Sequence, residues 1–101
     1  MTIGDTILAN PIMQCRILIH GRVQGVNFRY FTQQAAQRLG IRGFVRNLRN
    51  GGVEIAAEGE EAVLDEFVTL LRGGPPTAVV ESVEVEEHRL GGEHTSFRIE
   101  Y

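Results

Sequence analysis

The stretch from Gly21 to Arg29 reads Gly-Arg-Val-Gln-Gly-Val-Asn-Phe-Arg and contains residue types that could bind an oxyanion. It lies between a short β-rich segment and a segment with helical spacing, and the first backbone N–H groups of a helix have no intrahelical partner. Glycines let such a chain curl, so that several N–H groups can converge on one phosphate. Arg29 falls in the first helical turn, where its guanidinium can add a bidentate contact. This stretch therefore indicates a phosphate-binding loop.

The same spacing is also compatible with an ordinary turn that precedes a helix and with a solvated arginine. One observation favours a phosphate site. Arg29 sits near the positive end of the expected helix dipole, and a bound anion would remove that conflict. The loop lacks the Gly-Lys-Ser/Thr ending of a nucleotide P-loop, and the chain contains no lysine at all. We therefore expect neither ATP nor a magnesium-dependent nucleotide site.

Asn47 is the second candidate, because it lies near the end of an expected strand and just before an expected hairpin. A carboxamide offers one acceptor and two donors without carrying a charge. It can therefore hold a water molecule in a fixed orientation beside a bound anion. The strand alone favours a simpler role, in which Asn47 only shapes the turn.

Composition limits the classes of protein to which the chain can belong. It has 101 residues, of which 43% are hydrophobic and 23% charged, as in one soluble globular domain. The net charge of −3 argues against a nucleic-acid partner, and no apolar run reaches the roughly 20 residues of a membrane span. The single cysteine, Cys15, excludes an intramolecular disulfide and a cysteine-based zinc site. We expect a cytoplasmic monomer without metal or cofactor.

Hydrophobic periodicity predicts five strands and two helices. The Asn50-Gly51 pair predicts a tight hairpin, since both residues tolerate positive φ. The expected elements are a strand over 15–20, a helix over 28–39, strands over 41–48 and 53–58, a helix over 60–72, and strands over 78–88 and 95–101.

This order is βαββαβ followed by a final strand. It predicts an α+β, ferredoxin-like sandwich, in which two helices cover one face of a mostly antiparallel five-stranded sheet. Residues 1–14 lack periodicity and are expected to form a loosely ordered N-terminal arm, so that the domain comprises 15–101.

The same fold plan also carries RNA-binding modules and metal chaperones, so the fold alone does not identify a function. RNA-binding modules of the common type stack bases on aromatic side chains of their central strands. The segment 53–58 contains no aromatic residue and two glutamates. A copper chaperone would need paired cysteines, and the chain has one. Both classes are therefore disfavoured.

Two segments resemble the signatures of the acylphosphatase family. Residues 19–29, Ile-His-Gly-Arg-Val-Gln-Gly-Val-Asn-Phe-Arg, are similar to the first signature. Residues 43–47, Gly-Phe-Val-Arg-Asn, followed by Gly51, Val53 and Gly59, resemble the second at matching spacing. The resemblance covers about residues 14–101 and shows no departure at the motif positions.

The resemblance implies a metal-independent hydrolase that converts small-molecule acyl phosphates into a carboxylate and inorganic phosphate. It implies that Arg29 binds the phosphate and that Asn47 positions the attacking water. The substrate itself could then accept the proton, so no histidine, carboxylate or cofactor is needed. The loop residues expected to surround the phosphoryl oxygens are Arg22, Val23, Gln24, Gly25, Val26, Asn27 and Phe28. The alternative is a non-catalytic acyl- or carbamoyl-phosphate-binding module, like the acylphosphatase-like domain of a larger hydrogenase-maturation protein.

Overall fold

A computed structural model of the chain describes residues 12–88 and 94–101. Within these residues it contains five strands and two helices in the expected order. The elements are β1 (Ile12–Arg22), α2 (Phe28–Leu39), β2 (Arg42–Asn47), β3 (Val53–Glu60), α3 (Glu61–Gly73), β4 (Val79–His88) and β5 (Phe97–Glu100).

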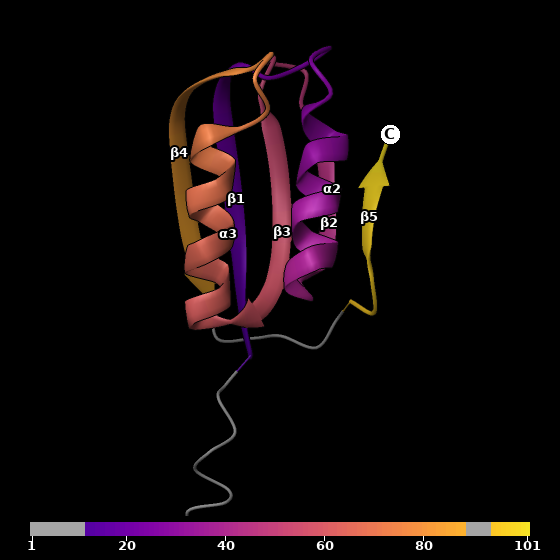
Figure 1. Cartoon of the computed structure of the whole chain (residues 1–101), viewed down its shortest axis with the longest axis vertical. Helices are drawn as coiled ribbons and strands as arrows, with labels where there is room; N and C mark the ends of the chain where they lie inside the picture. The colour runs from indigo at the N-terminus through magenta and orange to yellow at the C-terminus, as the bar shows by residue number, and fades with distance from the viewer. Residues whose placement is uncertain (1–11, 89–93) are drawn as a thin grey trace, which may run out of the picture.

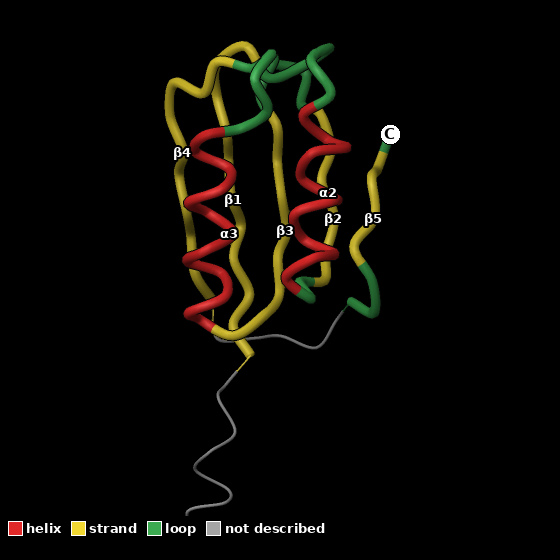
Figure 2. Tube along the Cα trace, viewed as in Figure 1, coloured by secondary structure: helices red, strands yellow, loops and turns green. Residues whose placement is uncertain are grey.

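The strands form one sheet in the order β4-β1-β3-β2-β5, and both helices cover the same face of it (Figure 1). Figure 2 shows the two layers clearly, with the helices in front of the strands. Strand β5 runs parallel to β2, whereas the other neighbouring strands are antiparallel. The predicted ferredoxin-like α+β sandwich is confirmed.

The core lies between this sheet and the helices. Alternate residues of the paired strands β1 and β3 face the helices, and Ile17 and Ile55, which pair directly, are both 0% exposed. Burial of such side chains is the main favourable contribution to folding. The ring of Phe67 on α3 meets the ring of Phe97 on β5 edge to face, with centroids 6.1 Å apart. Apolar packing therefore links the helix layer to the edge strand of the sheet.

Several element boundaries differ from the sequence-based expectation by one to three residues, and those of β1 and β5 bear on the site. Strand β1 begins at Ile12 rather than at residue 15, and its first residues pair with β3. Residues 12–14 of the expected arm therefore belong to the sheet, and the rest of that arm lies outside the described residues. Strand β5 covers only Phe97–Glu100, which is shorter than the expected 95–101.

Chain direction places several connections at one end of the sandwich. The β1–α2 loop, the β2–β3 hairpin and the α3–β4 connection all lie at this end, shown at the top of Figure 1. Because β5 is parallel to β2, its last residues also point to this end. The predicted phosphate-binding loop is thus close to segments that are distant in sequence.

The face of the sheet without helices carries a compact charge network. The carboxylate of Glu54 is 8% exposed and accepts hydrogen bonds of 2.6 Å from the Nε atoms of Arg16 and Arg46. Burial alone would raise the pKa of Glu54, but these two charge-assisted hydrogen bonds outweigh it and hold the pKa below its usual range. The network therefore joins β1, β3 and β2 through a carboxylate that is ionised at neutral pH.

Replacing Glu54 with glutamine should lower the free energy of unfolding by about 1–2 kcal/mol at neutral pH, because two half-exposed guanidinium groups lose the buried anion that they share. A carboxyl group whose pKa is lowered by folding stabilises the protein above its ordinary pKa. That contribution is lost as the pH falls through the lowered value. Denaturant unfolding of the variant and the parent chain should therefore differ at neutral pH and converge in acid. The exposed Glu81→Gln on β4 is the matched control; a Glu54→Gln deficit that persists unchanged in acid would contradict this account.

Candidate active site

The backbone of the β1–α2 loop turns twice through the left-handed region. Gly25 has φ 74° and Asn27 has φ 69°. Glycine adopts this conformation without steric cost, and asparagine is among the few other residues that tolerate it. Among the hydrogen bonds of the described turns and loops, none uses an N–H group of residues 23–28 as its donor. The loop therefore presents a group of backbone donors that are available to a ligand.

The start of helix α2 adds to this group of donors. Asn27 occupies the N-cap position, but its side chain makes no capping hydrogen bond, and the first turn contains no acidic residue. The positive end of the helix dipole is thus offset by neither a side-chain cap nor a carboxylate from its own first turn. An anion bound by the loop would interact favourably with this helix terminus.

Next to these donors lies a hollow of about 210 Å³, between the start of α2 and the ends of β2 and β5. It contains both residues that the sequence singled out for chemistry, Arg29 and Asn47. Its complete lining consists of Val23, Gly25, Asn27, Phe28, Arg29, Tyr30, Asn47, Ile99 and Tyr101.

Arg29 reaches this hollow from the first turn of α2. Its Nη1 atom donates a hydrogen bond of 3.3 Å to the carbonyl oxygen of Glu100, and its guanidinium lies 4.6 Å from the ring centroid of Tyr101. Within the described part of the chain, Arg29 forms no ion pair with a carboxylate. A guanidinium has five N–H donors, and this hydrogen bond uses one of them. Arg29 is therefore held in place while its charge stays available to an anion.

Asn47 reaches the hollow from the end of β2. Its Oδ1 atom is buried and has no hydrogen-bond partner among the residues that the structure describes. Such an atom is costly, and nearly all buried polar side-chain atoms have a partner. A donor bound in the hollow, such as the O–H of a water molecule, would satisfy it. This observation favours a ligand-binding role for Asn47 over the simpler role of shaping the turn.

The side chain of Gln24 turns away from the hollow. Its Nε2 atom donates to the carbonyl oxygens of Leu48 and Gly52, at 2.6 and 2.8 Å. These two carbonyls belong to the β2–β3 hairpin, which directly follows Asn47. Gln24 therefore joins the predicted phosphate-binding loop to the strand end that carries Asn47. The sequence predicted only that Gln24 lies in the loop; the hydrogen bonds of its side chain to the hairpin were not predicted.

The structure separates the predicted loop residues into two groups. Four of them line the hollow with Arg29 and Asn47: Val23, Gly25, Asn27 and Phe28. Arg22 and Val26 instead line a shallow depression beside Thr77, to which Gly25 and Asn27 also contribute. The sequence analysis also missed three lining residues, Tyr30, Ile99 and Tyr101. For Tyr101 a signal was present, since it alternates with Phe97 and Ile99 in the last expected strand.

The described residues contain neither a cluster of metal-ligating side chains nor a membrane-spanning helix. No group of three or more histidine, cysteine, aspartate or glutamate side chains is arranged to hold a metal ion in residues 12–88 and 94–101. In the same part of the chain, neither helix is long and apolar enough to cross a membrane.

The chain is similar to known proteins over most of its length. Residues 15–99 match the family model described as Acylphosphatase. An acylphosphatase of Archaeoglobus fulgidus is 47% identical over 85 residues, which covers 84% of this chain and 94% of that protein. The crystal structure of acylphosphatase from Bacillus subtilis superposes with a TM-score of 0.86 at 44% identity, covering 88% and 99% of the two chains.

A part of a larger protein is also similar. The crystal structure of full-length HypF in the phosphate- and nucleotide-bound form matches 92% of this chain with 12% of its own length. The TM-score is 0.80, and the two sequences are 31% identical. The architecture described above thus occurs both as most of a small protein and as a small part of a large one.

The variant Gln24→Ala should loosen the loop against the hairpin, because the carbonyls of Leu48 and Gly52 each lose one of their two donors. We expect the free energy of unfolding to fall by about 1–2 kcal/mol, measured by denaturant titration. Gln34→Ala, which makes the same change at an exposed position of α2, is the matched control and should leave stability nearly unchanged. Equal stability of the two variants would show that the Gln24 hydrogen bonds do not brace the loop.

Proposed function

Since this chain belongs to the acylphosphatase family and hydrolyses acyl phosphates to a carboxylate and inorganic phosphate, we propose specific roles for the residues around the hollow. Arg29 and the loop amides bind the phosphoryl group, and Asn47 orients the attacking water. One observation carries this proposal. An arginine without a carboxylate partner and a buried amide oxygen without a donor open into the same hollow, within the described part of the chain.

Phosphate binding follows from the charges and donors at this place. The phosphoryl group of an acyl phosphate carries negative charge on its non-bridging oxygens, and charge is redistributed over them as the P–O bond to the acyl group breaks. The amides of residues 23–28 and the guanidinium of Arg29 are donors that are already in position. Preorganised donors of this kind stabilise a transition state because they need no reorganisation during the reaction.

Asn47 acts on the water rather than on the phosphate. Its Oδ1 accepts a hydrogen bond from the water and so directs a lone pair of the water oxygen toward phosphorus. The water oxygen forms the new bond to phosphorus, and the carboxylate leaves with the electron pair of the broken P–O bond. None of the lining residues is a histidine or a carboxylate. The proton of the water therefore passes to a phosphoryl oxygen of the substrate.

We further propose that the protein acts as a cytoplasmic monomer on a small-molecule substrate, without a nucleic-acid or membrane partner. The net charge of −3 and the single cysteine support this proposal. The large apolar side chains that are exposed in the described part of the chain are scattered over several elements. Scattered exposed side chains do not form the contiguous patch that marks most stable interfaces.

The variant Arg29→Lys should lose most activity, because lysine retains the charge but not the planar fork that matches two phosphate oxygens. We expect kcat/KM for benzoyl phosphate to fall by about 10²-fold or more, and inhibition by inorganic phosphate to weaken. Assays should contain excess chelator, in which the parent chain stays active. Arg38→Lys, an exposed substitution on the same helix, is the matched control. Unchanged inhibition by phosphate in Arg29→Lys would remove Arg29 from the phosphate site.

The variant Asn47→Ala should separate turnover from phosphate binding. We expect kcat for benzoyl phosphate to fall by about 10²–10³-fold, while the inhibition constant of phosphate stays nearly constant. Asn50→Ala is the informative comparison, since Asn50 Oδ1 accepts the Gly52 amide at 2.9 Å and shapes the hairpin. It should affect stability far more than kcat. If Asn47→Ala instead weakened phosphate binding and spared kcat, the water-orienting role would be wrong.

A further inference from the structure

The phosphate-binding loop is braced from outside by the connection between α3 and β4. We propose that Thr77, on this connection, is a positioning residue that keeps one loop amide directed at the phosphoryl group of the substrate. The proposal rests on the phosphate site described above and extends it to a residue that lies outside the loop and outside the hollow.

Thr77 contacts the loop and the strand end that precedes it. Its Oγ1 donates a hydrogen bond of 2.8 Å to the carbonyl oxygen of Val26, 51 positions earlier in the chain. Its own carbonyl oxygen accepts a hydrogen bond of 3.2 Å from Nη2 of Arg22, at the end of β1. Thr77 therefore bridges the entrance and the middle of the loop.

The hydrogen bond to Val26 determines the direction of the next amide. The described backbone contains no cis peptide bond, and in a trans peptide the C=O and the following N–H point to opposite sides. The Val26 carbonyl points toward Thr77, which lines the shallow depression. The N–H of Asn27 therefore points away from Thr77, and Asn27 also lines the hollow together with Arg29.

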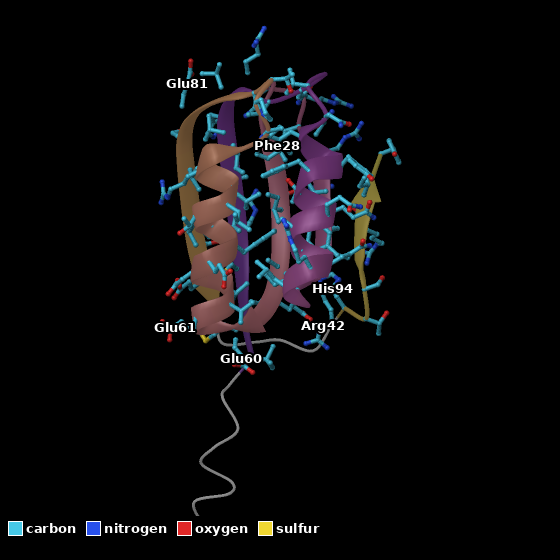
Figure 3. All side chains as sticks on the ribbon, viewed as in Figure 1. Phe28, Arg42, Glu60, Glu61, Glu81 and His94 are labelled. Atoms are coloured by element: carbon cyan, nitrogen blue, oxygen red, sulfur yellow. The ribbon has the colours of Figure 1, made fainter. Side chains whose placement is uncertain are left out.

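Thr77 can serve as an anchor because its own backbone is held firmly. The amide of Ala78 donates to the carbonyl of Pro75 at 3.0 Å, which closes a tight turn with Thr77 at its centre. Just before this turn, Gly74 packs so closely on Phe28 that an added Cβ would lie 3.1 Å from Cε2 of the ring. Phe28 is 1% exposed and lies at the loop end of the sandwich (Figure 3). The connection thus rests on the first residue of α2.

The expected effect of losing this hydrogen bond is on binding rather than on chemistry. Without Thr77, the peptide between Val26 and Asn27 can rotate and turn the Asn27 N–H away from the phosphoryl group. That amide contacts phosphoryl oxygens in the bound substrate and in the transition state alike. Losing an interaction common to both states raises KM and leaves kcat nearly unchanged. This pattern is the opposite of the one expected for Asn47→Ala.

The test compares Thr77→Val, which removes the hydroxyl and keeps the shape, with Thr77→Ser, which keeps the hydroxyl. For Thr77→Val we expect KM for benzoyl phosphate and the inhibition constant of inorganic phosphate to rise by about 3–10-fold, with kcat within about twofold. Thr77→Ser should restore both constants. Thr69→Val is the matched control, since Thr69 Oγ1 donates a hydrogen bond of 3.0 Å to the carbonyl of Asp65 on the exposed side of α3. It should leave both constants at their parent values.

A second measurement reports on the amide itself. In a titration with inorganic phosphate followed by ¹H–¹⁵N NMR, the Asn27 amide resonance should shift in the parent chain and shift far less in Thr77→Val. Unchanged KM and phosphate inhibition in Thr77→Val, or a Thr77→Ser variant as impaired as Thr77→Val, would overturn the assignment. If phosphate binding is weakened by Arg29→Lys but not by Thr77→Val, the positioning role of Thr77 is wrong and the phosphate site stands. If neither variant weakens phosphate binding, the proposed phosphate site is wrong as well.

Discussion

The site depends on one backbone constraint, the left-handed conformation at Gly25 and Asn27. In this conformation the amide N–H groups of residues 23–28 donate none of the hydrogen bonds found in the described turns and loops. Clustered N–H groups without a partner are costly in a folded protein unless water or a ligand meets them. The same groups are valuable to an enzyme whose substrate carries a compact negative charge. A feature that costs stability in the free protein is therefore the one that we propose binds the phosphoryl group.

Three different elements hold this conformation. The side chain of Gln24 joins the loop to the β2–β3 hairpin, the hydroxyl of Thr77 joins it to the α3–β4 connection, and Arg29 is tied to β5 through Glu100. Each contact uses a hydrogen bond to a backbone carbonyl rather than an ion pair. The charge of Arg29 is consequently not neutralised by its support. The guanidinium of Arg29 is thus held in a fixed position without an ion-pair partner among the described residues. Electrostatic catalysis requires a fixed charge of this kind.

Much of the fold and part of the site could be predicted from the sequence. Local signals sufficed where the determining interactions are local: the glycines before a helical pattern and Arg29 in its first turn predicted an anion-binding loop. The sequence could not show that β5 pairs in parallel with β2, because no local signal determines which edge of a sheet a final strand joins. The contacts of Arg29 with Glu100 and Tyr101 were therefore missed.

The hydrogen bond between Arg29 and the carbonyl of Glu100 spans 71 positions of the chain. Contacts of such long range form late, since the entropy of closing a large loop must be overcome first. During synthesis on the ribosome, the first helix is available long before its partner strand has been translated. Arg29, which we propose binds the phosphoryl group, consequently gains this support only when β5 has joined the sheet. Partially synthesised chains that end before residue 100 therefore lack this support, even when the loop before α2 is already present.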